Sequence, residues 1–311
     1  MTEITHQATD DSPARGAWWA TCGPVGECRA ALHKQVFRLT HTLADHPLFS
    51  LDALIGVAQE AARRKHDVHM DHGSVSISDK MDAASVPDLP VWEVVKRVET
   101  AGAWIVLKHV EADARYKVVI DAFTDFVRTV AGPESARLLR NPELIVLITS
   151  PNRLTPFHID KEINFLLQLQ GAKDVWVCDP SDRTVVTAHE LERFYAVNAW
   201  APTYKPDAES RAAQFLLAPG EAIHIPSHAA HWVRNHDNVS VSLSLNFEFP
   251  SWLQGDVYRA NYCLRRLGLS PRPPGQSVLA DRAKGAFGAV QRKAKRAGGV
   301  LYRSARKLLR R

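Results

Sequence analysis

Two histidines and an aspartate have the residue types and spacing of a metal centre. His158 and Asp160 are two positions apart in the segment TPFHID (residues 155–160), and His231 follows 73 residues later. In a strand, residues i and i+2 point to the same face, so the first two side chains can bind one cation. Two imidazoles and one carboxylate leave positions open on Fe(II) for a co-substrate and O₂, whereas Mg²⁺ prefers oxygen ligands and Zn²⁺ fits less well. The set predicts a non-haem Fe(II) centre.

A lysine and a polar strand face complete the candidate site. Lys173 follows the turn at Gly171, where its ammonium group is suited to neutralise a carboxylate in a partly dry pocket. Asn246 lies on the polar face of an alternating segment, residues 240–249, whose other face is apolar. That polar face either meets solvent or lines a wet pocket inside a barrel.

Other groups of metal-binding residue types are less well supported. The cluster His66, His69, Asp71 and His72 lies in a polar stretch ending at Gly73, and we expect a solvated loop there, without the supporting partners that a metal site needs. The four cysteines are few and scattered, which favours free thiols.

The elements that position these residues change in character along the chain. Helical spacing predicts helices over 51–64, after Pro90 and over 113–130, with Ser50 as an N-cap and a buried strand over 103–110. Short β-rich segments separated by Pro and Gly then predict a sandwich, barrel or jelly roll. They comprise residues 144–149, 164–170, 174–178, 215–217, 222–225 and 239–249. A Pro-Gly turn at 219–220 returns the chain to the barrel opening before His231.

The segment 155–173, together with the return over 219–246, resembles the Jumonji-C or cupin-like (cupin_8) family of Fe(II)- and 2-oxoglutarate-dependent oxygenases. The pattern is most similar to the branch that contains the asparaginyl hydroxylase factor inhibiting HIF. The resemblance implies a mostly β fold with helical additions, a double-stranded β-helix (jelly roll). It implies Fe(II), 2-oxoglutarate and O₂, with His158, Asp160 and His231 as iron ligands. The offset from Pro226 favours His231 over His228, which we expect at the cavity mouth.

The same resemblance implies roles for four further residues. Lys173 matches the base that pairs with the distal carboxylate of 2-oxoglutarate, and Thr155 matches its hydroxyl partner; Asn164 and Asn246 match residues lining the pocket. Two positions depart from the pattern. The branch uses an upstream tyrosine on the co-substrate, and here Trp104 or Lys108 is the candidate for that region; His224 replaces a usual aromatic residue.

These observations predict four regions and one activity. The regions are a leader (1–16), a helical N-terminal region (17–135) with the strand near 103–110, a jelly-roll catalytic core (136–255), and a C-terminal helix with a basic tail (256–311). The predicted activity is hydroxylation of an unidentified protein, RNA or small-molecule substrate, with demethylation as the same chemistry at an N-methyl group. The insertion 180–213 is expected to contribute to specificity. The alternatives are a metal-binding cupin of different activity and a regulatory binding module tethered by the tail.

Charge is distributed unevenly along the 311 residues. Residues 282–311 contain eleven Lys or Arg and no acidic residue, whereas residues 1–281 hold 28 basic and 34 acidic side chains, a net charge of −6. Apolar residues recur every three or four positions in the tail, which predicts an amphipathic helix. Its basic residues predict contact with an anionic membrane surface or with nucleic acid. The sequence leaves the oligomeric state of the protein open. Polar residues at the N-terminus and the lack of a long apolar run predict a cytoplasmic protein.

Overall fold

The structure is a computed structural model that describes residues 18–64, 66–80, 84–249 and 252–308. For residues 252–253 and 294–308 it describes the backbone only. The predicted leader, residues 1–16, lies outside the described residues. Within these ranges, no helix combines the length and apolar character needed to cross a bilayer.

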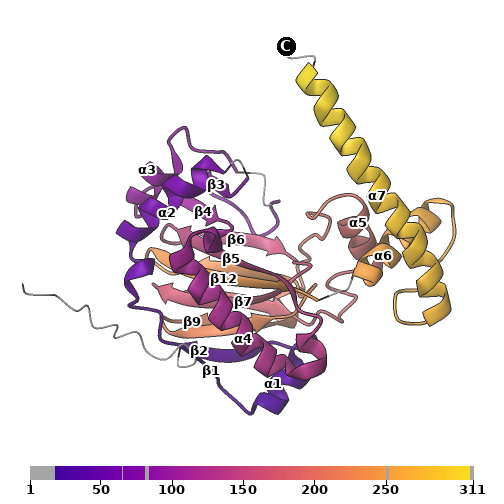
Figure 1. Cartoon of the computed structure of the whole chain (residues 1–311), viewed down its shortest axis with the longest axis horizontal. Helices are drawn as coiled ribbons and strands as arrows, with labels where there is room; N and C mark the ends of the chain where they lie inside the picture. The colour runs from indigo at the N-terminus through magenta and orange to yellow at the C-terminus, as the bar shows by residue number, and fades with distance from the viewer. Residues whose placement is uncertain (1–17, 65, 81–83, 250–251, 309–311) are drawn as a thin grey trace, which may run out of the picture.

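Two antiparallel sheets face each other and form the predicted jelly roll (Figure 1). The larger sheet has eight strands, in spatial order β1 (Trp19–Thr21), β2 (Phe37–His41), β10 (Glu221–Ile225), β7 (Ile163–Gln170), β12 (Ser240–Glu248), β5 (Arg140–Thr149), β4 (Ala103–Leu107) and β3 (Val68–His72). The smaller sheet has four, in the order β6 (Leu154–His158), β11 (His231–Asn235), β8 (Lys173–Cys178) and β9 (Ala212–Leu217). The predicted fold class is confirmed.

The two faces of β12 separate the apolar core from the barrel interior. Val241, Leu243 and Leu245 are fully buried among helix-covered core residues. On the other face, Ser242 hydrogen-bonds to Gln168 of β7, inside the barrel. The polar face therefore lines the interior, which resolves the choice between solvent and a wet pocket.

Helices cover the outer face of the larger sheet and extend the fold at its C-terminal end. They are α1 (Val25–Ala31), α2 (Leu51–Arg63), α3 (Val91–Lys96), α4 (Ala114–Ala136), α5 (Ala188–Ala196), α6 (Trp252–Arg266) and α7 (Val278–Leu308), with short 3₁₀ helices at Pro47–Phe49, Val110–Ala112 and Glu209–Arg211. The core joins α2, α3 and α4 to the sheet (Figure 1). Ser50 caps α2 as predicted, because its hydroxyl accepts a hydrogen bond from the Ala53 amide (3.3 Å).

The N-terminal region contains more β-structure than expected. Besides β4 it supplies β1, β2 and β3, of which β2 pairs with β10 and β3 pairs with β4. The prediction of a solvated loop around His69 is wrong, because that segment is β3, and Asp71 on it is buried and ion-paired with Arg153. These strands of three to five residues are too short for alternation to stand out in the sequence.

The last two helices form a closely packed pair. A Cβ atom on Gly288 of α7 would lie 1.9 Å from the carbonyl oxygen of Asp256 on α6, so only glycine allows this approach. The Asp256 carboxylate is fully buried and accepts two hydrogen bonds from Arg292 of α7, both 3.0 Å long. A charged pair of this geometry fixes α7 against α6.

Candidate functional site

Strand pairing brings the two predicted imidazole ligands together. In the register between β6 and β11, His158 is directly opposite His231, and their ring centroids are 4.1 Å apart. Asp160 lies two residues past the end of β6, where the chain turns toward β7. The segment that follows the Pro-Gly turn thus returns His231 to the mouth of the barrel.

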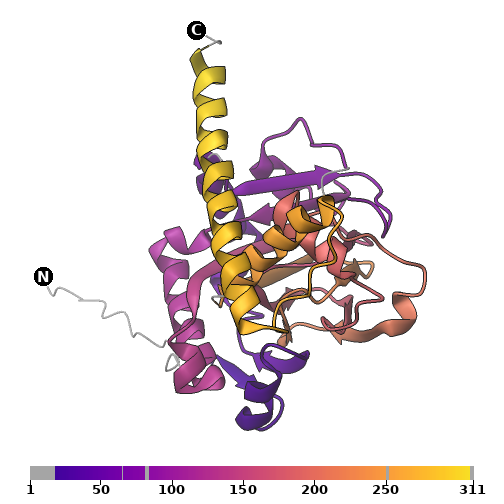
Figure 2. The ribbon, with the colours of Figure 1, turned by 90° about the vertical axis from the view of Figure 1, so that its right-hand side faces the viewer.

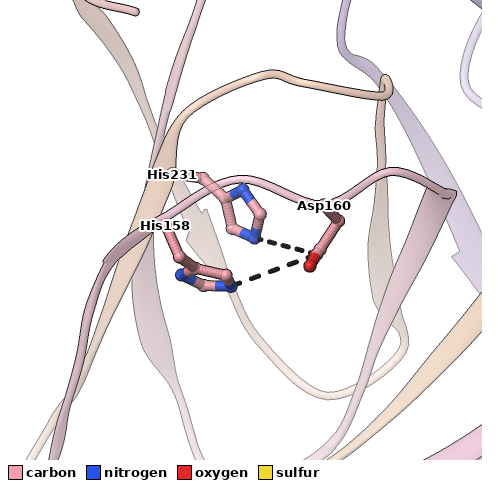
Figure 3. Close-up of side chains that lie close together, drawn as sticks. All are labelled: His158, Asp160 and His231. Atoms are coloured by element: carbon pink, nitrogen blue, oxygen red, sulfur yellow. Dashed lines mark ion pairs between the residues drawn. The ribbon is translucent and has the colours of Figure 1, made fainter. Parts of the chain in front are cut away.

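The three side chains point toward one another (Figure 3). Oδ2 of Asp160 lies 4.0 Å from Nε2 of His158 and 3.7 Å from Nε2 of His231. One potential ligand atom from each residue falls within 4.8 Å of the other two. Among the described residues, this is the one group of three or more His, Cys, Asp or Glu with such spacing.

Backbone carbonyls set the orientation of both imidazoles. Nδ1 of His158 is 2.8 Å from the Pro156 oxygen, and Nδ1 of His231 is 2.9 Å from the Ala229 oxygen. A carbonyl only accepts, so each Nδ1 carries the proton and donates it, and each Nε2 keeps its lone pair for a cation. Burial, reinforced by the neighbouring His158, lowers the pKa of His231 to about 4, so this ring is neutral near pH 7.

Comparison with known protein families identifies the family of this chain. The profile of the cupin-like domain family (Cupin_8) matches residues 58–251, more than half of the chain. The chain belongs to the cupin-like domain family. The family predicted from the segments around His158 and His231 is confirmed.

Individual proteins similar to this cupin-like chain match it less completely. HSPB1-associated protein 1 from Homo sapiens is 30% identical over 156 residues, which cover 46% of this chain and 31% of that protein. The Bos taurus protein of the same name is 29% identical with the same coverage, so the chain matches about a third of the length of these relatives.

Solved structures with a similar chain path include the Escherichia coli ribosomal oxygenase YcfD. One structure of YcfD is 13% identical, with a TM-score of 0.46, and the match covers 88% of this chain and 68% of that one. A structure of YcfD in complex with cobalt and succinic acid is 14% identical, with a TM-score of 0.41, and covers 88% and 67%.

The cupin-like barrel encloses a cavity of about 310 Å³ at the three candidate ligands. The other four residues singled out from the sequence line this same cavity: Thr155 on β6, Asn164 on β7, Lys173 on β8 and Asn246 on β12. Four strands of two sheets thus bring together side chains that are up to 91 residues apart.

Lys173 is a buried cation inside this cavity. Its side chain is 3% exposed, and burial lowers its pKa to about 7. Its ammonium group donates to Ser242 Oγ (2.7 Å), which in turn donates to Gln168 Oε1 (2.7 Å). Throughout the described part of the chain, no carboxylate forms an ion pair with Lys173. A buried cation without a counter-ion is costly, so the cavity favours an anionic ligand.

The cavity also contains a buried amide oxygen, that of Asn164, with an unfilled acceptor position. Asn164 donates through Nδ2 to Ser244 Oγ (2.8 Å), but its buried Oδ1 has no hydrogen-bond partner among the described residues. Ser244 in turn donates to Asn246 Oδ1 (3.3 Å). Buried acceptors are nearly always satisfied in folded proteins, so this atom is suited to contact a bound molecule.

Several cavity residues come from elements other than these four strands. Trp104 and Lys108, the candidates for the missing upstream tyrosine, both line the cavity from β4 and the residue after it. Trp200 reaches it from the insertion 180–213. His69 on β3 also lines it and contacts Trp104 edge to face, with ring centroids 5.3 Å apart. Sequence reasoning missed His69 because it assigned that segment to a loop.

Two other histidines lie outside the cavity. His224 is fully buried on the core side of β10, where its Nε2 hydrogen-bonds to the Leu32 carbonyl (2.6 Å) beside the ring of Phe165. His228 was expected at the cavity mouth, and this placement is wrong. It is buried with its Nε2 2.6 Å from the Tyr195 hydroxyl, and its backbone amide donates to the Asp160 carbonyl (2.8 Å).

The donor set fits Fe(II) better than other common cations. Two imidazoles and one carboxylate on one side of a cavity match the facial arrangement of non-haem Fe(II) centres, with room left for further ligands. Both imidazoles have the carbonyl partners that fix ligand orientation in metal sites. The residues present therefore fit the metal that the family resemblance implies.

Proposed function

We propose that this protein is an Fe(II)- and 2-oxoglutarate-dependent oxygenase that hydroxylates a C–H bond of its substrate. One observation supports this above the others. The candidate metal ligands share a single cavity with Lys173, a buried ammonium group with no carboxylate partner in the described chain. A ligand that chelates a metal at one end and presents a carboxylate at the other satisfies both features.

His158 and His231, through Nε2, and Asp160, through its carboxylate, would hold the iron. When bound, Fe(II) supplies the centre at which O₂ oxidises 2-oxoglutarate to succinate and CO₂ and transfers the second oxygen atom to a C–H bond. The carbonyls of Pro156 and Ala229 keep the imidazoles in position. The cavity walls exclude water from this chemistry.

Residues deeper in the cavity would orient the co-substrate. The ammonium group of Lys173 pairs with the distal carboxylate, and the Thr155 hydroxyl donates to it, in the roles that the resemblance implies. Ser242 and Gln168 hold Lys173 in place by the hydrogen bonds described above. The side-chain amides of Asn164 and Asn246 line the same cavity, joined through the Ser244 hydroxyl by hydrogen bonds.

Turnover without added substrate tests the proposal. The full chain is incubated aerobically with Fe(II) and 2-oxoglutarate, and succinate is measured. We expect succinate that depends on both additions and is suppressed by N-oxalylglycine, an unreactive mimic of the keto acid. Because such turnover is slow in many enzymes, binding of N-oxalylglycine to the metal-loaded protein is measured in parallel. Absence of both succinate and N-oxalylglycine binding would favour a differently acting cupin or a binding module.

The pH dependence of co-substrate affinity follows from Lys173. Burial lowers its pKa to about 7, and a bound carboxylate stabilises the ammonium form and raises this pKa. Below pH 7 the Lys173 amine is already charged. Above pH 7 the amine must take up a proton when the carboxylate binds. We expect the affinity for 2-oxoglutarate to fall by about tenfold per pH unit above pH 7.

Anaerobic titration calorimetry measures this dependence without turnover. At a pH above 8, the binding enthalpy is measured in two buffers of different ionisation enthalpy. The difference between the two values should correspond to uptake of about one proton per 2-oxoglutarate bound. An affinity that stays level between pH 7 and 9 would show that Lys173 is not the group that receives the carboxylate.

A further inference from the structure

Over residues 278–293, whose side chains the structure describes, the long C-terminal helix α7 packs on the rest of the protein through a face without large apolar side chains. Gly285 and Gly288 are buried, and Gly288 touches the backbone of Asp256 on α6. One turn further, Arg292 donates two hydrogen bonds to the buried Asp256 carboxylate. The glycine contact, this ion pair and hydrogen bonds from Lys284 to the Arg272 carbonyl and from Gln291 to Cys263 therefore attach α7, in place of the apolar stripe that normally covers a core.

Over residues 278–293, where the side chains of α7 are described, its large apolar residues face solvent instead. Leu279 is 79% exposed, Val290 66% and Phe287 51%, and Val278 at the first position is 69% exposed. Leu279 and Val290 are eleven residues apart, three helical turns, so they lie on one face, opposite Gly288. A row of exposed apolar side chains on a regular helix indicates a surface that a partner covers.

The positive charge of residues 282–311 indicates which kind of partner covers this face. Residues 282–311 contain eleven Lys or Arg and no acidic residue, and Arg282 and Lys293 are exposed beside the apolar row. Two copies of so basic a helix repel each other, which disfavours self-association. Nucleic acid would satisfy the charge but leave Leu279 and Val290 uncovered. An anionic lipid surface matches both features, because its headgroups attract the basic residues while its acyl boundary accepts the apolar ones.

The position of α7 leaves this face accessible. In both views α7 runs along the outside of the fold and its C-terminal half extends beyond it (Figures 1 and 2). Its 31 residues span about 46 Å, enough to lie along a bilayer over several headgroups.

We propose that the exposed face of α7, formed by Leu279, Phe287 and Val290 and flanked by Arg282 and Lys293, docks on the surface of an anionic lipid bilayer. The helix lies in the interfacial plane and carries the barrel at the membrane surface. This inference is independent of the proposed catalytic function, because it uses no residue of the cavity.

Vesicle flotation of the full chain tests the docking surface. The probes are vesicles of phosphatidylcholine alone and vesicles in which about a third of the lipid is phosphatidylglycerol. We expect at least about tenfold stronger partitioning to the anionic vesicles, weakening as salt is raised. The double variant L279S/V290S should lose about tenfold or more of this binding, because two apolar side chains no longer insert.

Matched variants separate this effect from a general loss of surface hydrophobicity. Val86 and Leu216 are also exposed, at 64% and 49%, but lie away from α7, so V86S/L216S should bind vesicles like the unmodified protein. Circular dichroism is used to check that the L279S/V290S protein has the helix content of the unmodified protein. Equal binding to both vesicle types, or undiminished binding of L279S/V290S, would overturn the proposal. So would a lack of vesicle binding combined with tight binding to a duplex DNA or RNA probe.

Discussion

Replacing His158, Asp160 or His231 with alanine is expected to remove iron-dependent turnover. Each residue supplies one of three donor groups whose ligand atoms fall within 4.8 Å of one another, so loss of one leaves an incomplete set. We expect succinate formation to fall by about a thousandfold or more, since the activity depends on the bound metal. Succinate is measured by mass spectrometry, and the iron content of each anaerobically loaded variant is measured alongside.

His236 provides a matched control for these substitutions. It lies just after β11, is exposed, and pairs with Asp174 on the outside of the barrel (2.9 Å). His236→Ala should retain both iron and turnover, and thermal unfolding should show that all variants are folded. Full iron occupancy and undiminished succinate formation in the Asp160→Ala protein would contradict the assigned metal centre.

Replacing Lys173 with methionine is expected to act on the co-substrate rather than on the metal. Methionine fills a similar volume without the charge, so the distal carboxylate of 2-oxoglutarate would be buried without a counter-ion. We expect the affinity for 2-oxoglutarate to fall by about a hundredfold. Iron binding should be unchanged, because Lys173 is not among the grouped ligand residues. Anaerobic calorimetry measures both affinities.

Two comparisons make the Lys173 result specific. Lys173→Arg retains a positive charge and should recover part of the affinity, although its larger side chain does not fit the hydrogen bond to Ser242 as well. Lys108→Met removes the other lysine that lines the cavity. Equal losses in the Lys108 and Lys173 variants would mean that the cavity responds to total charge, and that no single lysine receives the carboxylate.

Much of the barrel could be predicted from local sequence pattern. The alternation along Ser240–Glu248 identified a strand with one polar face, and the same period placed Asn246 on that face. Ser50 marked the start of α2, because a cap and the following apolar spacing are both local signals. His158, Asp160 and His231 could be grouped as candidate ligands because their spacing resembles a family motif, and the structure brings them together.

Features that depend on contacts between distant segments were missed. Nothing local shows that β2 pairs with β10, or that β3 joins the edge of the larger sheet and brings His69 to the cavity. The partner of His228 could not be predicted either, because Tyr195 comes from the insertion and reaches it only in the fold. Glycine lowers the propensity of a segment to form a helix, but Gly288 permits the close contact of α7 with α6, which no local signal shows.

The hydrogen bonds of His228 connect the insertion to the metal centre. Its ring is held by Tyr195 on α5, and its amide holds the backbone of Asp160. We expect a substrate that moves α5 to shift the backbone of Asp160 and thereby to alter the affinity of the candidate site for iron. By thermodynamic reciprocity, iron would then change the affinity for that substrate by the same factor. Metal loading and substrate selection would form a single coupled equilibrium.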